Sequence, residues 1–233
     1  MIRNIFANHG ITITEEQEQK LNQYYDLLID WNNKINLTSI VEYEEVIWKH
    51  FLDSAFFVSC DKVDLKEKKK VLDLGTGAGF PGMVLAILCP DYEFVLADSL
   101  NKRIEFLKVV INRLQIHNVS VIHGRAEELG RDENFRNQFD YVVSRAVAEL
   151  PVLLEYCIPF VKKGGYFVSY KSRRLDEEIE NAENALNMLY TKYEKKYKYE
   201  LEYDHSERYL VFFRCENITD SKYPRKPKKI KTN

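Results

Sequence analysis

The chain has few cysteines and no long apolar run, and both absences narrow what it can be. Its 233 residues include four cysteines, none in a C-x-x-C pair, so neither a metal site nor a disulfide framework is expected. No apolar stretch approaches the ~20 residues that cross a membrane, and the N-terminus does not read as a secretory leader. We therefore expect a soluble cytoplasmic protein whose 45% hydrophobic residues suffice for a sizeable core.

Glycine is also scarce, with nine in the chain, but four of the nine lie between residues 75 and 82. An apolar run that ends near Asp73 leads into them, and an apolar helix-like segment follows from residue 83. This is the pattern of a parallel strand, a tight turn and a helix whose first N–H groups are free to face a ligand. The turn, in which Gly75, Gly77 and Gly79 alternate with other residues, is typical of sites for nucleotide-type cofactors.

Two cofactor motifs fit this turn, and the position of the acid decides between them. Residues 77–82 match the G-x-G-x-x-G pattern of dinucleotide folds, whereas residues 73–79 match the acid-x-G-x-G-x-G pattern of proteins that bind S-adenosyl-L-methionine (SAM). In a dinucleotide site the first glycine directly follows the strand and a pyrophosphate lies at the helix N-terminus. The Asp73 carboxylate would repel a pyrophosphate but attract the sulfonium and ammonium groups of SAM. The sequence therefore favours SAM.

A second acid lies where a nucleoside needs one. Residues 92–98 are expected to form the next strand, which ends at Asp98, 23 residues after Gly75. At that spacing a carboxylate accepts hydrogen bonds from ribose hydroxyls, in NAD and SAM alike. Capping the helix expected from Asn101 is the alternative role, and one residue can serve both.

Strand-like and helix-like segments alternate along the chain, which predicts a parallel sheet with helices on both faces. The expected strands cover residues 71–74, 92–98, 119–124, 139–144 and 165–171, with an antiparallel pair at 193–203 and 208–215. The expected helices, besides the one after the glycine turn, cover residues 14–34, 43–59, 101–115, 149–160 and 175–190. This is the α/β, Rossmann-like fold of class I SAM-dependent methyltransferases, with a seven-stranded, mostly parallel sheet. We expect an N-terminal helical extension over 1–62, the SAM-binding domain over 63–216 and a basic, flexible tail over 217–233.

Three further strand ends carry polar residues, at the edge where doubly wound folds place ligands. After the third strand, the Ala126 N–H and the Glu127 side chain are suited to bracket an adenine, with a plain surface loop as the alternative. Arg145 follows the fourth strand, where a charge is costly unless something occupies the cleft, so a functional role is favoured over the alternative of a structural ion pair. Lys171 ends the fifth strand and Arg173 follows, and these cations suit a phosphate or the O6/N7 edge of a purine. A solvated face is the alternative for this last pair.

Two kinds of methyl acceptor are disfavoured by what the strand ends lack. Methylation of an exocyclic amine needs an Asn/Asp-Pro-Pro-aromatic clamp, where this chain has Ser144, Arg145 and Ala146. Methylation at C5 of a pyrimidine needs a cysteine nucleophile at a strand end, and neither Cys89 nor Cys157 lies at one. Guanine N7 fits what remains, because its lone pair is free and its methylation needs alignment with the donor but no base.

A set of segments, in order over nearly the whole chain, carries a further pattern: Trp31–Thr38, His50–Ser54, Val71–Gly82, Asp98–Arg103, Arg125–Glu127, Ser144–Ala146, Val161–Gly165, Lys171 and Tyr223–Lys226. Together they resemble the bacterial guanine-N7 methyltransferases of small-subunit ribosomal RNA, the RsmG family, once called glucose-inhibited division protein B. The resemblance implies that the substrate is a guanine in the 530 loop of 16S rRNA, in naked RNA or an immature small subunit. One departure is Pro227-Lys228-Lys229, where the family usually has Gly-Thr-Pro.

Motifs and resemblance together define three sets of candidate residues. The catalytic set is Arg145, Lys171 and His50. The cofactor-binding set is Asp73, Gly75, Gly77, Gly79, Phe80, Asp98, Ser99, Ala126, Glu127 and Arg145. The RNA-binding set is Lys102, Arg103, Arg125, Lys171, Arg173, Arg225 and Lys226.

Several alternatives stay open from the sequence. His50 and Asp53, three apart on one expected helix, share a face, either as a structural hydrogen-bonded pair or with His50 reaching the cleft or the RNA. The basic tail either attracts phosphates or only aids solubility. The rival functions are methylation of another RNA or of a small molecule, an NAD-linked oxidoreductase, and an RNA-binding module without activity. We expect a monomer.

Overall fold

The computed structural model describes residues 1–145, 148–172, 175–226 and 230. At its centre lies a seven-stranded sheet in the order β3-β2-β1-β4-β5-β7-β6. The five strands from β3 to β5 run parallel, and β7 is antiparallel to both of its neighbours. The expected seven-stranded, mostly parallel sheet is confirmed. The strands are β1 (Lys70–Leu74), β2 (Glu93–Asp98), β3 (Val119–His123), β4 (Phe139–Arg145), β5 (Val161–Lys171), β6 (Thr191–Leu201) and β7 (Ser206–Cys215).

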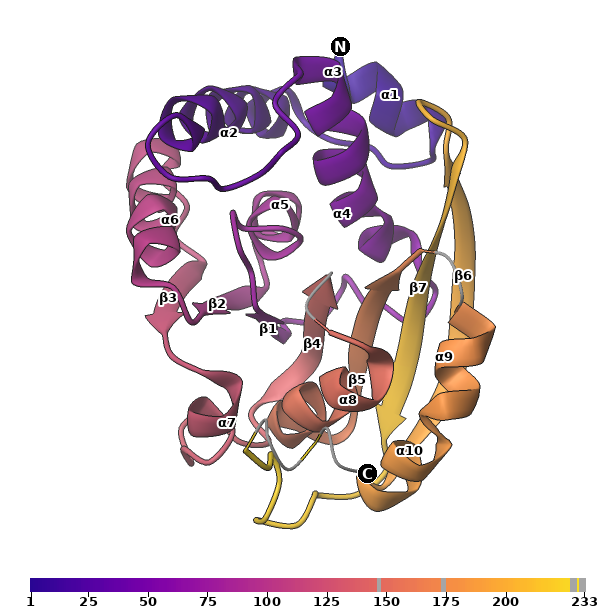
Figure 1. The fold of residues 1–233 in the computed structure, drawn as a ribbon. Helices are drawn as coiled ribbons and strands as arrows, with labels where there is room; N and C mark the ends of the chain where they lie inside the picture. Colours follow the sequence, from indigo (N-terminus) through magenta and orange to yellow (C-terminus); the bar gives the residue numbers. More distant parts are fainter. Residues whose placement is uncertain (146–147, 173–174, 227–229, 231–233) are drawn as a thin grey trace.

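Helices cover both faces of this sheet (Figure 1). One face carries α1 (Ile2–Asn8), α2 (Glu15–Asn32), a helical run over residues 43–59, α5 (Gly82–Leu88) and α6 (Asn101–Leu114). The other face carries α7 (Ala126–Leu129), α8 (Leu150–Cys157) with the 3₁₀ turn η3 (Ile158–Phe160), α9 (Leu175–Asn181) and α10 (Glu183–Met188). Among the helices of the described ranges, none is long and apolar enough to cross a membrane.

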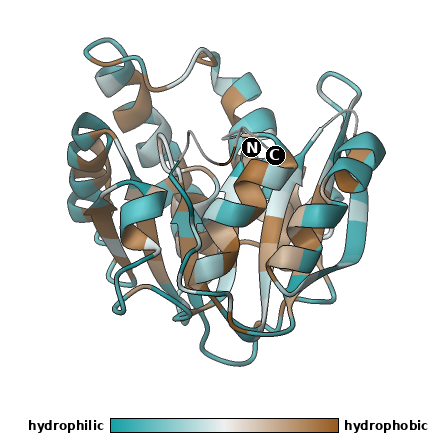
Figure 2. Ribbon diagram, turned by 60° about the horizontal axis from the view of Figure 1, so that its bottom comes forward, coloured by the Kyte–Doolittle hydropathy of each residue, from teal (hydrophilic) through white to brown (hydrophobic). Residues whose placement is uncertain are grey.

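The strands bury apolar side chains on both faces because successive residues of a strand point to opposite sides. Val71 of β1 belongs to the cluster under α2, α5 and α6, whereas its neighbour Leu72 belongs to the cluster under α8 and α10. Figure 2 shows hydrophobic residues concentrated along the strands and on the sides of the helices that face them. All four cysteines are free and buried in these layers.

The N-terminal helices share the core of the sheet. Tyr24 of α2 is fully buried, and its ring lies 5.6 Å from that of Phe51, 5.4 Å from Phe80 and 6.4 Å from Phe106. Its hydroxyl donates a hydrogen bond to the Ala78 carbonyl oxygen, in the glycine turn. Tyr24 of the N-terminal segment therefore supports the turn directly.

The helical run over residues 43–59 is continuous, as expected, but not uniformly α-helical. It consists of α3 (Tyr43–Val46), the π-helix η1 (Ile47–Leu52), α4 (Asp53–Ala55) and the 3₁₀ helix η2 (Phe56–Ser59). π-Helices are rare and frequently occur at functional sites. This one carries His50, and Asp53 follows it directly, so both side chains reach the end of β4.

Other boundaries also differ from expectation. The helix expected over 175–190 is two helices, α9 and α10, separated at Ala182. Strand β4 continues one residue further than expected, so that Arg145 itself pairs in register with Tyr170 of β5. The short helices α1 and α7 had no counterpart in the sequence interpretation.

Residues 217–226 pack against the core, where the sequence predicted a flexible tail. The Arg136 guanidinium donates hydrogen bonds to the carbonyl oxygens of Thr219 (2.8 Å), Asp220 (2.9 Å) and Tyr223 (2.7 Å). Arg225 forms an ion pair of 2.8 Å with Glu155, which is only 3% exposed. The physical reason is that the Arg136 guanidinium binds three carbonyl oxygens of this segment, and the buried Glu155 carboxylate needs donors, which Arg225 supplies. Residues 227–229 and 231–233 of the expected tail lie outside the described residues.

Candidate active site

Asp73 stabilises the turn between β1 and α5 from the buried side, through hydrogen bonds to the turn. This residue is completely buried, and its Oδ2 accepts hydrogen bonds from the Gly82 N–H (2.7 Å) and the Thr76 hydroxyl (2.7 Å). Its Oδ1 has no hydrogen-bond partner among the described residues. Burial raises the pKa of Asp73 to about 6. The sequence placed this carboxylate in the cofactor site, but it lies beneath the turn and shapes it.

Above the turn lies a cavity of about 380 Å³, which we call the loop cavity. Six of its lining residues belong to the predicted cofactor-binding set: Gly75, Gly77, Phe80, Asp98, Ser99 and Arg145. The others are Leu37, Thr38, His50, Thr76, Ala78 and Arg103. The backbone from β1, the end of β2 and the segment after α2 thus meet around one space, as expected for a ligand site at the carboxyl edge of a parallel sheet.

Asp98 binds backbone on both sides of the loop cavity, although it does not cap α6, whose N-cap position is Leu100. Its Oδ1 accepts a hydrogen bond from the Leu100 N–H (2.9 Å), just before α6, and its Oδ2 accepts one from the Gly77 N–H (2.9 Å). The carboxylate therefore joins the start of α6 to the glycine turn and at the same time lines the loop cavity.

Four residues of the predicted cofactor-binding set do not line the loop cavity. Asp73 is beneath the turn, and Gly79 faces Tyr24, Leu107 and Met83 in the core. Ala126 and Glu127 begin α7, beyond β3, and lie outside the lining of this cavity.

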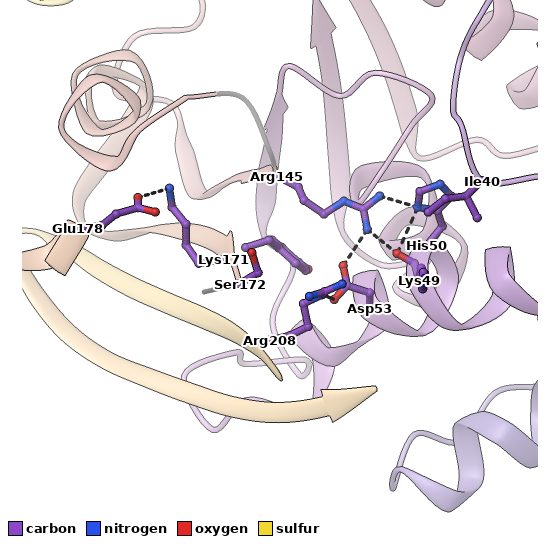
Figure 3. Close-up of a pocket in the computed structure, with 10 residues that line it drawn as sticks. Ile40, Lys49, His50, Asp53, Arg145, Lys171, Ser172, Glu178 and Arg208 are labelled. Atoms are coloured by element: carbon purple, nitrogen blue, oxygen red, sulfur yellow. Dashed lines mark hydrogen bonds and ion pairs between the residues drawn. The ribbon is translucent and has the colours of Figure 1, made fainter. Parts of the chain in front are cut away.

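A second cavity of about 460 Å³ adjoins the first, and we call it the basic cavity. Figure 3 shows the residues that line it: Ile40, Lys49, His50, Asp53, Arg145, Tyr170, Lys171, Ser172, Glu178 and Arg208. It contains four cationic side chains and two carboxylates, which makes it suited to a ligand with acceptor groups. His50 and Arg145 line both cavities and form the wall between them.

Arg145 is the centre of this wall. Its Nη1 donates to Asp53 Oδ2 (2.8 Å) and to the Lys49 carbonyl oxygen (3.1 Å), and its Nη2 donates to His50 Nδ1 (3.1 Å). The guanidinium also lies 5.3 Å from the centre of the Phe80 ring. The costly charge at this strand end is thus balanced by Asp53, which the sequence did not connect with it.

His50 has both ring nitrogens engaged. Arginine can only donate, so Nδ1 accepts from Arg145, and we assign the remaining proton to Nε2, which lies 2.9 Å from the Thr38 hydroxyl oxygen. The ring stacks on Phe80 at 4.4 Å. Burial, together with the Arg145 charge, lowers the pKa of His50 to about 3. A neutral imidazole with no free nitrogen supports the structural alternative for His50.

This low pKa predicts how acid affects stability. An unfolded histidine titrates near pH 6.5, so between about pH 6.5 and 3 the unfolded chain binds one more proton at this site than the folded protein does. Stability from His50 is therefore present above pH 6.5 and is lost as the pH falls. Between pH 7 and 5 the wild type should lose about 2 kcal/mol more unfolding free energy than His50→Gln, whose amide can replace both hydrogen bonds.

Urea denaturation of both proteins at the two pH values measures this difference. The raised pKa of Asp73 acts in the opposite sense between about pH 4 and 6, because stability from that group is lost as the pH rises. This contribution of Asp73 is the same in the wild type and in His50→Gln, so it cancels when their pH dependences are compared. Equal pH dependence in the two proteins would mean that His50 is solvated in the folded state.

The predicted RNA-binding residues fall into three groups. Lys102, Arg125 and Lys226 are exposed. Three others are in ion pairs, Arg103 with Asp98, Lys171 with Glu178 and Arg225 with Glu155. Arg173 lies outside the described residues.

Lys171 was also expected in the catalytic set, and it does line the basic cavity. Its Nζ lies 2.6 Å from Glu178 Oε2, and its side chain is 10% exposed. Sequence reasoning missed Glu178 as well as Lys49 and Arg208. No motif marks them, because they come from α9, η1 and β7 and meet only in the folded chain. Within the described residues, no group of three or more metal-ligating side chains is placed to hold an ion.

The strand order, the glycine turn and the acid at the end of β2 define a class I SAM-dependent methyltransferase. Solved structures share this fold: M. jannaschii TYW2 in complex with AdoMet has a TM-score of 0.51 at 16% identity, over 64% of this chain and 70% of that one. The Methanococcus jannaschii fibrillarin pre-rRNA processing protein has a TM-score of 0.52 at 19% identity, over 66% and 70%. These likenesses concern the fold alone.

Sequence comparison gives the family. A family model described as rRNA small subunit methyltransferase G (GidB) matches residues 17–205, and the chain belongs to this family. The ribosomal RNA small subunit methyltransferase G of Lachnoclostridium phytofermentans is 50% identical over 93% of this chain and 88% of its own length. That of Alkaliphilus metalliredigens is 48% identical over 94% and 90%. The resemblance inferred from the motifs is confirmed.

Proposed function

We propose that this protein transfers a methyl group from SAM to N7 of a guanine in 16S ribosomal RNA. The observation that carries the proposal is the pair of adjoining cavities that share the His50–Arg145 wall. One has the features of a nucleoside cofactor site, and the other has the charge expected for a nucleotide acceptor. The names of the relatives supply the class of RNA.

The loop cavity fits SAM by the chemistry of its lining. Asp98 offers a carboxylate for the ribose, and the turn offers backbone at Gly75 and at Gly77, beside which the space is open. Phe80 and Leu37 offer apolar surface. When bound, SAM supplies an electrophilic methyl group on a sulfonium. The protein's own task is to orient the acceptor toward that group and to exclude water.

The basic cavity fits a guanine presented from the RNA. Positive charge moves from the sulfonium to the purine during transfer, so a cation beside N7 would oppose the reaction. Arg145 and Lys171 therefore serve the guanine O6 or a phosphate, which accept hydrogen bonds. No general base is required, in keeping with the neutral, fully engaged His50.

Finer details belong to the same proposal. We infer that the target lies in the 530 loop, that the RNA is naked or in an immature subunit, and that the protein acts as a monomer. The exposed Lys102, Arg125 and Lys226 are candidates for the RNA backbone. Binding through such contacts weakens steeply with salt.

The test is transfer of labelled methyl from SAM to small-subunit rRNA by the purified protein, followed by mass mapping of the product. We expect one 7-methylguanosine in 16S rRNA and none in large-subunit rRNA. The same nucleoside should be absent from 16S rRNA of cells that lack the protein. Methylation at another atom, or of large-subunit rRNA alone, would contradict the proposal. Binding of NADH in place of SAM, measured by calorimetry, would favour an oxidoreductase.

A further inference from the structure

The acceptor capacity of Asp98 is fully used. Each carboxylate oxygen accepts one backbone N–H, from Leu100 at Oδ1 and from Gly77 at Oδ2, both at 2.9 Å. The second place on each oxygen is taken by a single atom, Arg103 Nη1, at 3.4 Å from Oδ1 and 3.1 Å from Oδ2. With this pair in place, the Asp98 side chain is only 2% exposed. A ribose therefore has no free acceptor on Asp98 while Arg103 stays there.

The Arg103 contact is not the strong form of an arginine–carboxylate pair. That form uses two guanidinium nitrogens on the two oxygens, whereas here one nitrogen serves both. Arg103 Nε is buried and has no hydrogen-bond partner among the described residues. The side chain as a whole is 32% exposed, on the first turn of α6 at the loop cavity. An incompletely bonded guanidinium with access to solvent is easily exchanged for another ligand of Asp98.

The ribose of the cofactor could replace Arg103, because it matches the acceptor places on Asp98 in number and in chemistry. Removal of Arg103 frees one acceptor place on each Asp98 oxygen, two in all, and a ribose carries two vicinal hydroxyl donors. We propose that Arg103 occupies the place of the cofactor ribose, and that the cofactor displaces it so that its guanidinium becomes available to an RNA phosphate. The first half concerns the cofactor site alone; the second half depends on the proposed function.

This arrangement makes the two ligands bind in a preferred order. Before the cofactor binds, Arg103 is held by Asp98; afterwards its released charge adds to that of its exposed neighbour Lys102 at the start of α6. The RNA should therefore bind more tightly to the protein that already holds its cofactor. By linkage, the RNA should tighten cofactor binding by the same factor.

The cofactor half is tested by calorimetry with S-adenosylhomocysteine, which carries the ribose but no transferable methyl group. Because Arg103 competes with the ribose, Arg103→Met should bind S-adenosylhomocysteine about 5- to 10-fold more tightly than the wild type. Arg113→Met, on the last turn of the same helix and exposed, removes the same charge and should bind like the wild type. Unchanged or weaker binding by Arg103→Met would overturn the proposal, because Arg103 would then be a bystander or a cofactor ligand. Melting curves establish that the variant is folded, and Arg103→Gln replaces it if it is not.

The RNA half is tested by measuring the binding of 16S rRNA with and without saturating S-adenosylhomocysteine. The wild type should bind the RNA about 5-fold or more tightly with the compound present, and Arg103→Met should show no such gain. A wild type that is indifferent to the compound, or an Arg103→Met variant that keeps the gain, would overturn this half. The calorimetry uses no RNA, so it tests the competition between Arg103 and the cofactor even if the proposed methylation is wrong.

Discussion

Arg145→Met should lower methyl transfer by about 100- to 1,000-fold and the free energy of unfolding by about 3 kcal/mol. The kinetic loss is expected because Arg145 lies in the wall between the two cavities, where a small misplacement of donor and acceptor is costly. The stability loss is expected because the substitution removes the shorter of the two ion pairs of Asp53, which is 5% exposed: Arg145 Nη1 lies 2.8 Å from it and Arg208 Nε 3.9 Å. Asp53 keeps a hydrogen bond from the Tyr199 hydroxyl, which limits the loss.

A second substitution separates these two effects. In Asp53→Asn/Arg145→Met no buried charge is left alone, so most of the lost stability should return, while methyl transfer should remain low. Urea denaturation and single-turnover transfer to 16S rRNA, measured on the four proteins of this cycle, give both quantities. Recovery of transfer together with stability would mean that Arg145 only balances Asp53 and makes no contact with the substrate.

The position of Arg145 could be predicted from the sequence, but its ion-pair partner could not. A charge after an apolar strand predicted a site at the end of β4, and the structure places Arg145 between two cavities. The pattern gave no sign of Asp53, which lies 92 residues earlier, at the start of α4, and reaches Arg145 only in the folded chain. The strands, their mostly parallel arrangement and the edge that holds the cofactor could be predicted from hydrophobic periodicity and turn residues, which are local. Ion-pair partners are decided by tertiary packing.

The predicted RNA contacts show the same limit. Arg103, Lys171 and Arg225 were assigned to RNA because they are cations in suitable segments. Each is paired with a carboxylate, and for Arg225 that carboxylate lies 70 residues away. Positive charge is visible in a sequence, but whether it is already neutralised depends on the fold. The same holds for Asp73, whose place beneath the turn depends on hydrogen bonds to Thr76 and Gly82 that the motif alone does not specify.

The glycines of the turn look equivalent in the motif, yet their substitution by alanine should have different results. At Gly79, with φ of +100°, an added Cβ meets the Tyr24 hydroxyl, comes within 2.9 Å of Leu107 Cδ2 and lies 3.0 Å from Met83 Cβ. At Gly77, with φ of +62°, it meets no atom within 4 Å and projects into open space at the loop cavity. The first substitution therefore affects folding, and the second affects cofactor binding.

Gly79→Ala combines a backbone conformation that alanine rarely adopts with overlap in a packed core, so it should lower the unfolding free energy by roughly 3–5 kcal/mol. For a chain of this size that corresponds to a melting temperature lower by roughly 6–20 °C. Gly77→Ala adopts a left-handed conformation that costs about 1 kcal/mol, but should weaken S-adenosylhomocysteine binding at least ~10-fold, because its methyl group occupies cofactor space. Thermal melts and calorimetry on the pair measure both effects. If the two variants were equally stable, the contact of Tyr24 with the turn would be adaptable; if Gly77→Ala bound the compound normally, the cofactor would have to lie elsewhere in the cavity.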